Sequence, residues 1–248
     1  MYRKKHYDAT YLEVLSEIYK DVKDYTTEWI MNEGPESLLD LGCGKGIDTF
    51  RLANFVSEVV GIDHDPRMLE VAKEHLFLYD NVNLHRREAE DTGYEDEYFD
   101  CILADRIILH LFNPEKVLRE MMRVLKKDGS CIIVETDWCS MNFFSPYIMQ
   151  EFEIIQTKVN EVLHNGLSCR IVSHQFQEMG MELEDFKIFP LITNRYEIAD
   201  YILRLEVVYK TLQEKGVNID KLRKYMAEKE EKGQFMASWD VFVYHFRK

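Results

Sequence analysis

The chain has 248 residues, the length of one large domain, and 46% of them are hydrophobic and 31% charged. This composition is typical of a globular protein and excludes a disordered or collagen-like chain. Its 31 lysines and arginines against 45 aspartates and glutamates give a formal net charge of −14, which disfavours nucleic acid or an anionic membrane as the main partner. No apolar run has the length of a membrane helix, the first residues are polar, and five cysteines are scattered, so we expect a cytoplasmic protein with reduced thiols and no metal site.

Short apolar runs alternate with amphipathic stretches through the first half of the chain. We expect strands at these runs, which cover residues 37–41, 58–62, 82–85, 101–104 and 130–135. Helices are predicted to begin at Pro66 and at Pro114, and the second should end at residues 126–129, where Gly129 would cap it. This alternation predicts βαβ units and a parallel sheet.

Three further segments have the periodicity of amphipathic helices. They cover residues 8–31, 145–164 and 196–232, and the last is broken near Gly216. Apolar runs at 185–193 and 235–247 are typical of strands. No repeat and no low-complexity linker interrupts the sequence, which favours a single α/β domain with helical additions.

A glycine-rich loop follows the first predicted strand. Gly42, Gly44 and Gly46 stand at alternate positions, and a helical pattern comes next, so the loop can approach a ligand closely. A dinucleotide-binding loop requires glycine where Ile47 stands, and a phosphate-binding P-loop requires Gly-Lys-Ser/Thr, so neither motif fits. Asp40, on the strand before the loop, suits a ligand that carries an ammonium or sulfonium charge.

Asp63 ends the second predicted strand, 21 residues after Gly42. This is the place where an acid accepts hydrogen bonds from a ribose diol in nucleotide-binding α/β folds. Taken alone, Asp63 can also be a solvated loop residue. Its position together with the glycine loop favours the ribose contact.

Four sequence blocks stand in order between residues 36 and 138. They read LDLGCGKG at 39–46, VGIDHDPRML at 60–69, EAED at 88–91 with FD at 99–100, and LHL at 109–111 with Pro114 and RVLKKDG at 123–129. In these blocks the chain resembles class I S-adenosylmethionine-dependent methyltransferases, within the small-molecule branch that includes the ubiquinone and menaquinone biosynthesis enzymes. The resemblance implies a Rossmann-like, mostly parallel seven-stranded sheet with helices on both faces and the last strand antiparallel.

The resemblance also implies how one methyltransferase domain over residues 1–248 is divided. We expect an N-terminal helical cap at 1–35, a cofactor-binding core at 36–140, helical lid insertions at 141–166 and 195–232, and the last strands at 185–193 and 235–247. The cofactor would be S-adenosyl-L-methionine, and the family pattern assigns its contacts: Asp40 near the amino group, Gly42, Gly44 and Gly46 at the methionine end, Asp63 on the ribose, His64 and Met68 beside the adenine, Glu88 and Ala89 at its polar edge, and Ala104 at the end of the fourth strand. Glu88 departs from the family's usual aspartate.

Residues after the fourth and fifth strands are candidates for the methyl acceptor, because ligands of open α/β sheets bind beyond the carboxyl ends of the strands. His110 is the candidate general base, and Arg106, Asp137 and Trp138 are candidate substrate contacts. His110 can equally be a structural histidine, and Arg106 can pair with a neighbouring acid. An aromatic cluster near the fifth strand either stacks on the acceptor or belongs to the core; its members are Trp138, Phe143, Phe144 and Tyr147.

The predicted activity is transfer of a methyl group to O, N or C of a small molecule, and the negative net charge favours a neutral or cationic acceptor. The alternative is a non-catalytic, regulatory protein that binds S-adenosylmethionine. A nicotinamide-dependent oxidoreductase is disfavoured by the glycine spacing. The sequence leaves the acceptor and the oligomeric state open.

Overall fold

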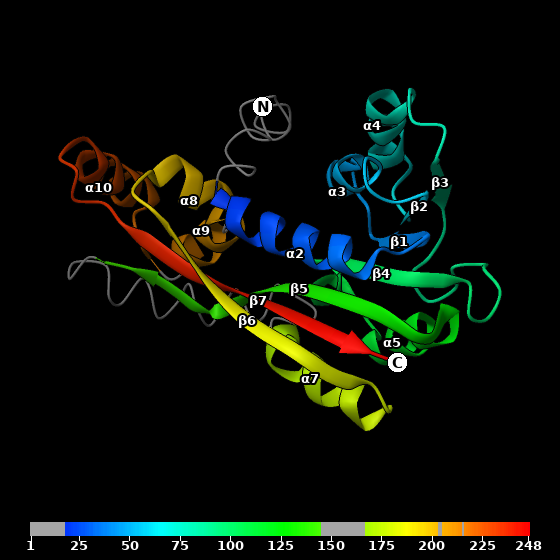
Figure 1. Cartoon of the computed structure of the whole chain (residues 1–248). Coiled ribbons are helices and arrows are strands. Elements are labelled where there is room, and N and C mark those ends of the chain that lie inside the picture. The colour runs from blue at the N-terminus through cyan, green and yellow to red at the C-terminus, as the bar shows by residue number, and fades with distance from the viewer. Residues whose placement is uncertain (1–17, 145–166, 203–204, 215) are drawn as a thin grey trace. The chain divides into compact units, whose positions relative to one another are not determined.

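The computed structural model describes residues 18–144, 167–202, 205–214 and 216–248 (Figure 1). The chain divides into two compact units, which we describe separately. The core unit comprises Asp24–Glu135, Ser168–Lys187 and Phe242–Lys248, and the helical unit comprises Met1–Lys23, Thr136–Leu167 and Ile188–Val241. Residues 8–17 and 145–164 of the predicted helices, and Tyr147, lie outside the described residues.

Seven strands form one mixed sheet in the order β3-β2-β1-β4-β5-β7-β6. Their bounds are β1 Ser37–Leu41, β2 Glu58–Asp63, β3 Val82–Arg86, β4 Phe99–Asp105, β5 Leu125–Phe143, β6 Glu182–Thr193 and β7 Ala237–Arg247. The first five strands pair in parallel. β7 runs against β5, since Asp128 and Gly129 exchange backbone hydrogen bonds with Lys248. The predicted sheet is confirmed, and β5, β6 and β7 continue from the core unit into the helical unit.

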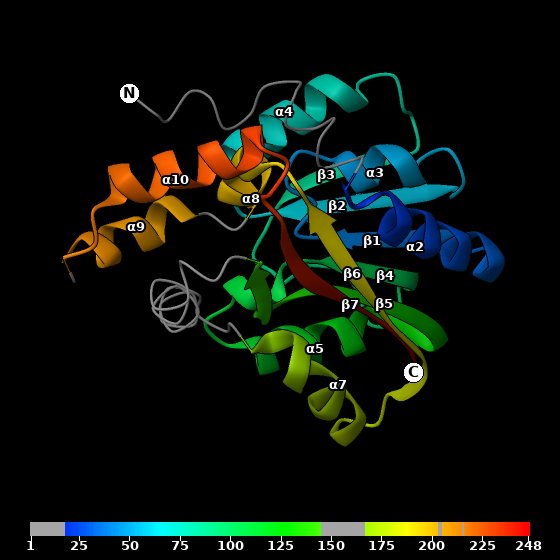
Figure 2. The same cartoon turned by 90° about the vertical axis from the view of Figure 1, so that its left-hand side faces the viewer.

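Helices cover both faces of the sheet in the core unit. They are α2 Lys20–Glu33, α3 Ile47–Leu52, α4 Pro66–Leu76, the 3₁₀ turn η1 Ile108–His110, α5 Pro114–Val124 and α7 Ser168–Glu178. Figure 2 shows α3 and α4 on one side of the sheet and α5 and α7 on the other. Successive side chains of a strand point to opposite faces of its sheet. In β7, Trp29 of α2 packs on His245 and Phe176 of α7 packs on the next residue, Phe246, so α2 and α7 cover opposite faces.

The predicted starts of α4 and α5 are confirmed. Each helix has proline in its first turn and a side-chain cap before it: Asp65 accepts a hydrogen bond from the Arg67 N–H, and Asn113 accepts one from the Lys116 N–H. The buried faces of the two helices carry Leu69 and Ala72 in α4, and Val117, Leu118 and Met121 in α5. These apolar stripes fix both helices against the sheet.

The predicted glycine cap after α5 is wrong. The helix ends at Val124, and Leu125 is already extended and pairs with Phe99 of β4. The left-handed turn further on is made by Asp128, whose φ is 60°, and not by Gly129. The Leu125 side chain is buried in the core, which favours an extended backbone from this residue on. The strand therefore begins before Lys126 and Lys127, the cationic residues that suggested a helix end.

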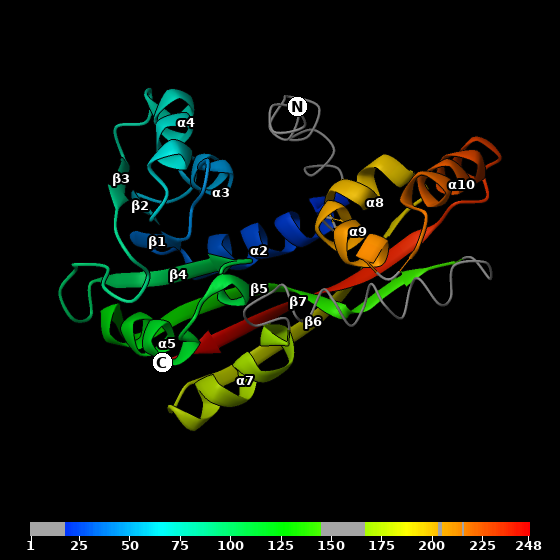
Figure 3. The ribbon, with the colours of Figure 1, turned by 180° about the vertical axis from the view of Figure 1, so that it is seen from behind.

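Three helices of the helical unit pack on one another: α8 Tyr196–Ile202, α9 Leu205–Glu214 and α10 Ile219–Glu231 (Figure 3). The predicted break near Gly216 is confirmed, since this glycine has a φ of 83° and Asn218 caps the following helix. None of the described helices is long and apolar enough to cross a membrane.

Candidate functional site

The glycine loop joins β1 to α3 at the carboxyl end of the parallel strands. Gly42, Gly44 and Gly46 have φ angles of 76°, 53° and 75°, which side-chain-bearing residues rarely adopt. A Cβ on Gly42 would lie 2.7 Å from the Ile107 Cδ1, so tight packing requires glycine there. A Cβ on Gly44 would meet no described atom within 4 Å, so this part of the loop is open to a ligand.

Asp63 connects the end of β2 to the glycine loop. Its Oδ2 accepts a hydrogen bond from the Gly44 N–H at 2.9 Å, and its Oδ1 accepts one from the Asp65 N–H at 2.8 Å. A carboxylate has about four acceptor positions, so Asp63 keeps acceptor capacity for hydroxyl groups of a ligand. Its side chain is 11% exposed, which leaves that capacity at the protein surface beside Gly44.

Asp40 is buried beneath the loop. Its Oδ2 accepts a hydrogen bond from the Thr49 hydroxyl at 2.5 Å, which ties β1 to the first turn of α3. The structure therefore gives Asp40 a role in shaping the glycine loop and the helix that follows. Its predicted contact with an amino group stays a prediction.

Of the residues predicted beside the adenine, His64 follows β2, Glu88 and Ala89 come soon after β3, and Met68 lies in the first turn of α4; β2 and β3 are neighbours in the sheet. His64 and Glu88 are exposed, whereas Met68 and Ala89 are partly buried. The backbone of Glu88 closes a tight turn, because its carbonyl accepts a hydrogen bond from the Asp91 N–H at 3.1 Å. The fold thus gathers these residues along one edge, next to Asp63.

Ala104 and Arg106 occupy the end of β4. Ala104 is fully buried and pairs with Leu41, directly before the glycine loop. Arg106 has a φ of 54°, an unusual value for an arginine, and its Nε donates to the Asp105 Oδ1 at 2.8 Å. The structure therefore shows the ion pair with a neighbouring acid that the sequence left open.

His110 ends the η1 turn and is exposed. The turn is closed by its own backbone, since the His110 N–H donates to the Ile107 carbonyl at 2.9 Å. Ile107 is also the residue that packs on Gly42. The candidate base thus belongs to a segment in direct contact with the glycine loop.

Asp137 and Trp138 belong to the helical unit. The buried Asp137 accepts a hydrogen bond from the Cys139 N–H at 3.0 Å, and its backbone carbonyl accepts one from the Ser140 hydroxyl at 2.7 Å. The Ser140 oxygen in turn accepts from the Asp240 N–H of β7. Burial, with the nearby charge of Asp137, raises the pKa of Asp240.

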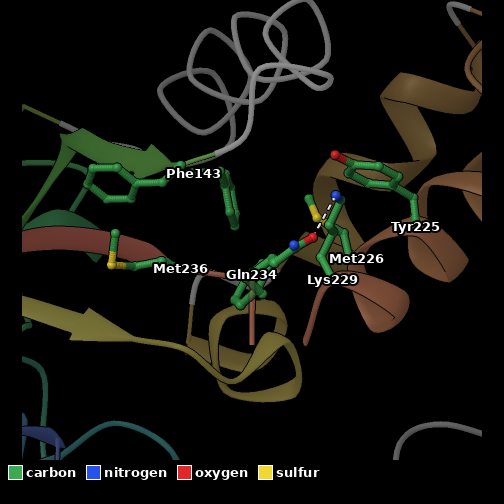
Figure 4. A pocket seen from close by; sticks show the side chains of 8 residues that line it. Phe143, Tyr225, Met226, Lys229, Gln234 and Met236 are labelled. Carbon is green, nitrogen blue, oxygen red and sulfur yellow. Dashed lines mark hydrogen bonds between the residues drawn. The ribbon is translucent and has the colours of Figure 1, made fainter. Parts of the chain in front are cut away.

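Two of the predicted aromatic residues, Phe143 and Phe144, line a shallow pocket within the helical unit. Figure 4 shows Phe143, Tyr225, Met226 and Met236 around it, with the Lys229 Nζ donating to the Gln234 Oε1 at 3.0 Å. The remaining lining residues are Phe144 and Phe235. Phe143 is nearly fully buried, as expected of a core side chain.

Glu135 is not among the site residues predicted from the sequence. Its side chain is fully buried in β5, and its Oε1 accepts a hydrogen bond from the Ile108 N–H at 2.7 Å. Its pKa is raised from 4.5 to about 8, chiefly by burial and also by the charge of Asp105, although the hydrogen bonds from the Ile108 and Leu109 N–H groups lower it. A lone glutamate at the end of an apolar strand was the available signal.

The sequence model of the methyltransferase-domain family matches residues 33–186, which is more than half of the chain. The chain therefore belongs to this family, whose class I members use S-adenosyl-L-methionine as the methyl donor.

Two relatives show how far the similarity extends. A 37.1 kDa protein in transposon TN4556 of Streptomyces fradiae is 28% identical over 174 residues, which are 69% of this chain and 50% of that protein. The demethylmenaquinone methyltransferase of Clavibacter sepedonicus is 33% identical over 110 residues, 44% of this chain and 45% of that enzyme. The chain spans about half the length of these curated relatives.

Solved structures share the fold over most of the chain. Protein BH2331 of Bacillus halodurans matches with a TM-score of 0.68 and 21% identity, covering 92% of this chain and 99% of that one. The YcgJ protein of Bacillus subtilis matches with a TM-score of 0.62 and 17% identity, covering 91% and 98%. At these identities the comparison establishes the architecture.

Proposed function

We propose that this protein is an S-adenosyl-L-methionine-dependent methyltransferase that methylates a small-molecule acceptor at O, N or C. The observation that carries the proposal is the Gly44–Asp63 hydrogen bond at the carboxyl end of β1 and β2. It joins an open glycine loop to an acid with spare acceptor capacity, inside a chain of the methyltransferase-domain family.

The residues present fit the proposed cofactor. Gly42, Gly44 and Gly46 would hold the methionine end, and Asp63 would accept hydrogen bonds from the ribose hydroxyls. His64 and Met68 would flank the adenine, with Glu88 and the Ala89 N–H at its polar edge and Ala104 on the floor below. Asp40 supports the loop through Thr49 and contributes negative charge toward a cationic ligand.

When bound, S-adenosyl-L-methionine supplies the methyl group of its sulfonium. The protein's contribution is alignment and exclusion of water, which together can lower a barrier by about 7–11 kcal/mol in favourable systems. His110 would accept a proton from an acceptor that must lose one. Arg106 would position an acidic group while paired with Asp105. The predicted acceptor contacts at Asp137 and Trp138 stay predictions.

Several coarser expectations belong to the same proposal. We propose one methyltransferase domain over residues 1–248, with the cap, core, lid and last-strand boundaries given by the sequence. All five cysteines lie in described residues and are free thiols, which supports a reducing, cytoplasmic environment. The net charge of −14 supports a small molecule rather than nucleic acid as the partner.

Transfer of a labelled methyl group tests the proposal. The full chain is incubated with methyl-labelled S-adenosyl-L-methionine and, first, a reduced demethylmenaquinone, the substrate class in the names of several relatives. A panel of phenols, amines and small-molecule extracts follows. Label should enter one acceptor class, and transfer at subsaturating cofactor should fall in Asp63→Ala. Cofactor binding without transfer to any acceptor would favour the regulatory alternative.

A further inference from the structure

Glu135 lies where three segments of the core unit meet. The fully buried side chain comes from β5, and its Oε1 accepts the Ile108 N–H of η1 at 2.7 Å. Its second oxygen, Oε2, accepts a hydrogen bond from the hydroxyl of Ser168, the first residue of α7, at 3.3 Å. One carboxyl group therefore fastens η1 and α7 to the sheet.

The η1 turn in turn packs on the glycine loop. Ile107, the residue before η1, lies so close to Gly42 that a Cβ there would be 2.7 Å from its Cδ1. The preceding residue, Arg106, is fixed to β5 because its N–H donates to the Val134 carbonyl at 2.7 Å. A displacement of Ile108 would move Ile107 against Gly42, since tightly packed contacts transmit shifts.

The cost of burying a carboxyl group indicates that the position has a purpose beyond packing. A buried acid needs hydrogen-bond partners, and an apolar residue would fill the same volume without that requirement. The Glu135 side chain is long enough to accept a hydrogen bond from the Ile108 N–H. The hydrocarbon side chains typical of a strand interior have no acceptor atom and cannot do this. From β4, the charge of Asp105, which is paired with Arg106, acts on Glu135.

We propose that Glu135 is a positioning residue of the methyltransferase site: its carboxyl group holds η1, and through Ile107 the glycine loop, in the geometry that binds the cofactor. This inference rests on the proposed function, because it assigns the glycine loop to S-adenosyl-L-methionine. Glu135 itself acts through the backbone of η1. His110 and Arg106, on the same segment, are placed by the same contact.

Four variants of the full chain test the proposal. Glu135→Gln keeps the length of the side chain and an acceptor oxygen, and its amide can donate to Ser168. Glu135→Asp keeps the carboxyl group but is one methylene shorter. Glu135→Ala removes the carboxyl group altogether. Asp100→Asn is the matched control, because Asp100 also accepts a backbone N–H, that of Ser37 at 2.9 Å, but at the opposite end of β4.

Hydrogen–deuterium exchange of the amides of Ile108 and Leu109, and calorimetry with S-adenosyl-L-homocysteine, are the two measurements. We expect Glu135→Ala and Glu135→Asp to lose protection at η1 by about 10-fold or more and to bind the ligand about 10-fold more weakly. Glu135→Gln should stay within about 3-fold of the wild type, and Asp100→Asn should match it at η1.

The outcomes distinguish a failure of the Glu135 proposal from a failure of the proposed methyltransferase function. Wild-type affinity and wild-type η1 protection in folded Glu135→Ala would overturn the Glu135 proposal, as would a Glu135→Gln variant as impaired as Glu135→Ala. If the alanine and aspartate variants do not fold, Ser168→Ala replaces them in the test. We expect it to lose less than about 10-fold in η1 protection, and unchanged protection would contradict the proposal. Failure of the wild type to bind the ligand would refute the proposed function, while exchange at η1 still reports the contact.

Discussion

Asp63 is the central side chain of the proposed cofactor site, because it bonds the glycine loop and is partly exposed beside it. Replacing it with alanine removes charge-assisted hydrogen bonds to the ribose and the bond that orders Gly44. We expect Asp63→Ala to weaken S-adenosyl-L-homocysteine binding by about 1.5–3 kcal/mol, roughly 10- to 150-fold, measured by calorimetry. The control is Asp80→Ala, which removes an equal charge before β3, at the opposite end of the strands. Equal affinities of both variants would contradict the ribose assignment.

Two glycines of the loop should respond differently to alanine. In Gly42→Ala the new methyl collides with Ile107, so the free energy of unfolding should fall by about 1–3 kcal/mol. In Gly44→Ala only the positive φ is penalised, by about 1 kcal/mol, but the methyl occupies space that the ligand needs. Urea denaturation and ligand titration on both variants separate the effects. A Gly44→Ala protein with wild-type affinity would show that the ligand does not approach this loop.

Protonation of Glu135 makes stability depend on pH. Its pKa is raised to about 8 by burial, above the 4.5 of an exposed glutamate, so the folded protein keeps a proton that the unfolded chain releases. The stabilisation is complete below about pH 4.5 and is lost as the pH rises through about 8, with a slope of at most about 1.4 kcal/mol per pH unit.

Denaturation of the wild type and of Glu135→Gln between pH 5.5 and 8.5 measures this contribution. Other titrating groups cancel in the comparison, so the wild type should lose unfolding free energy relative to the variant as the pH rises. Parallel curves for the two proteins would show that Glu135 is ionised throughout this range.

At the scale of the elements, the N-cap of α5 tests whether this helix is coupled to the site, because the helix begins shortly after η1. The Asn113 side chain accepts the Lys116 N–H. Asn113→Ala should lower the free energy of unfolding by about 0.5–2 kcal/mol, and Asn113→Asp, an equally good cap, should not. Ligand affinity should be equal in both variants. A parallel loss of affinity would mean that α5 moves with the site.

Local patterns determined which elements the sequence could predict. Pro66 and Pro114 with their caps predicted the starts of α4 and α5, and the β-branched runs located five strands in order. The end of α5 was missed because the burial of Leu125, a tertiary effect, overrides the local glycine signal. α7 was missed because no proline marks its start, which falls at Ser168, whereas prolines mark the starts of α4 and α5.

The same division holds for the site. The glycine loop and Asp63 were predictable because fixed spacing along the chain brings them to neighbouring strand ends. Glu135 was not, because its importance comes from contacts with η1 and α7, which lie far from it in sequence. The Arg106–Asp105 ion pair was one of two open alternatives, and only the three-dimensional structure shows it; a contact of Arg106 with the acceptor stays a prediction.

For the whole molecule, the acidic composition and the family assignment point in the same direction. A net charge of −14 attracts a cationic sulfonium ligand and repels polyanions. The family match covers residues 33–186, so much of the helical unit, including α8, α9 and α10, lies beyond it. We therefore expect the features that distinguish this protein from other methyltransferases to reside in that unit.

Calorimetric titration of the full chain with S-adenosyl-L-methionine and S-adenosyl-L-homocysteine tests the central claim most directly. We expect both ligands to bind saturably at one site per chain, and Asp63→Ala to weaken both. The absence of binding by either ligand at concentrations up to about 1 mM would contradict the account.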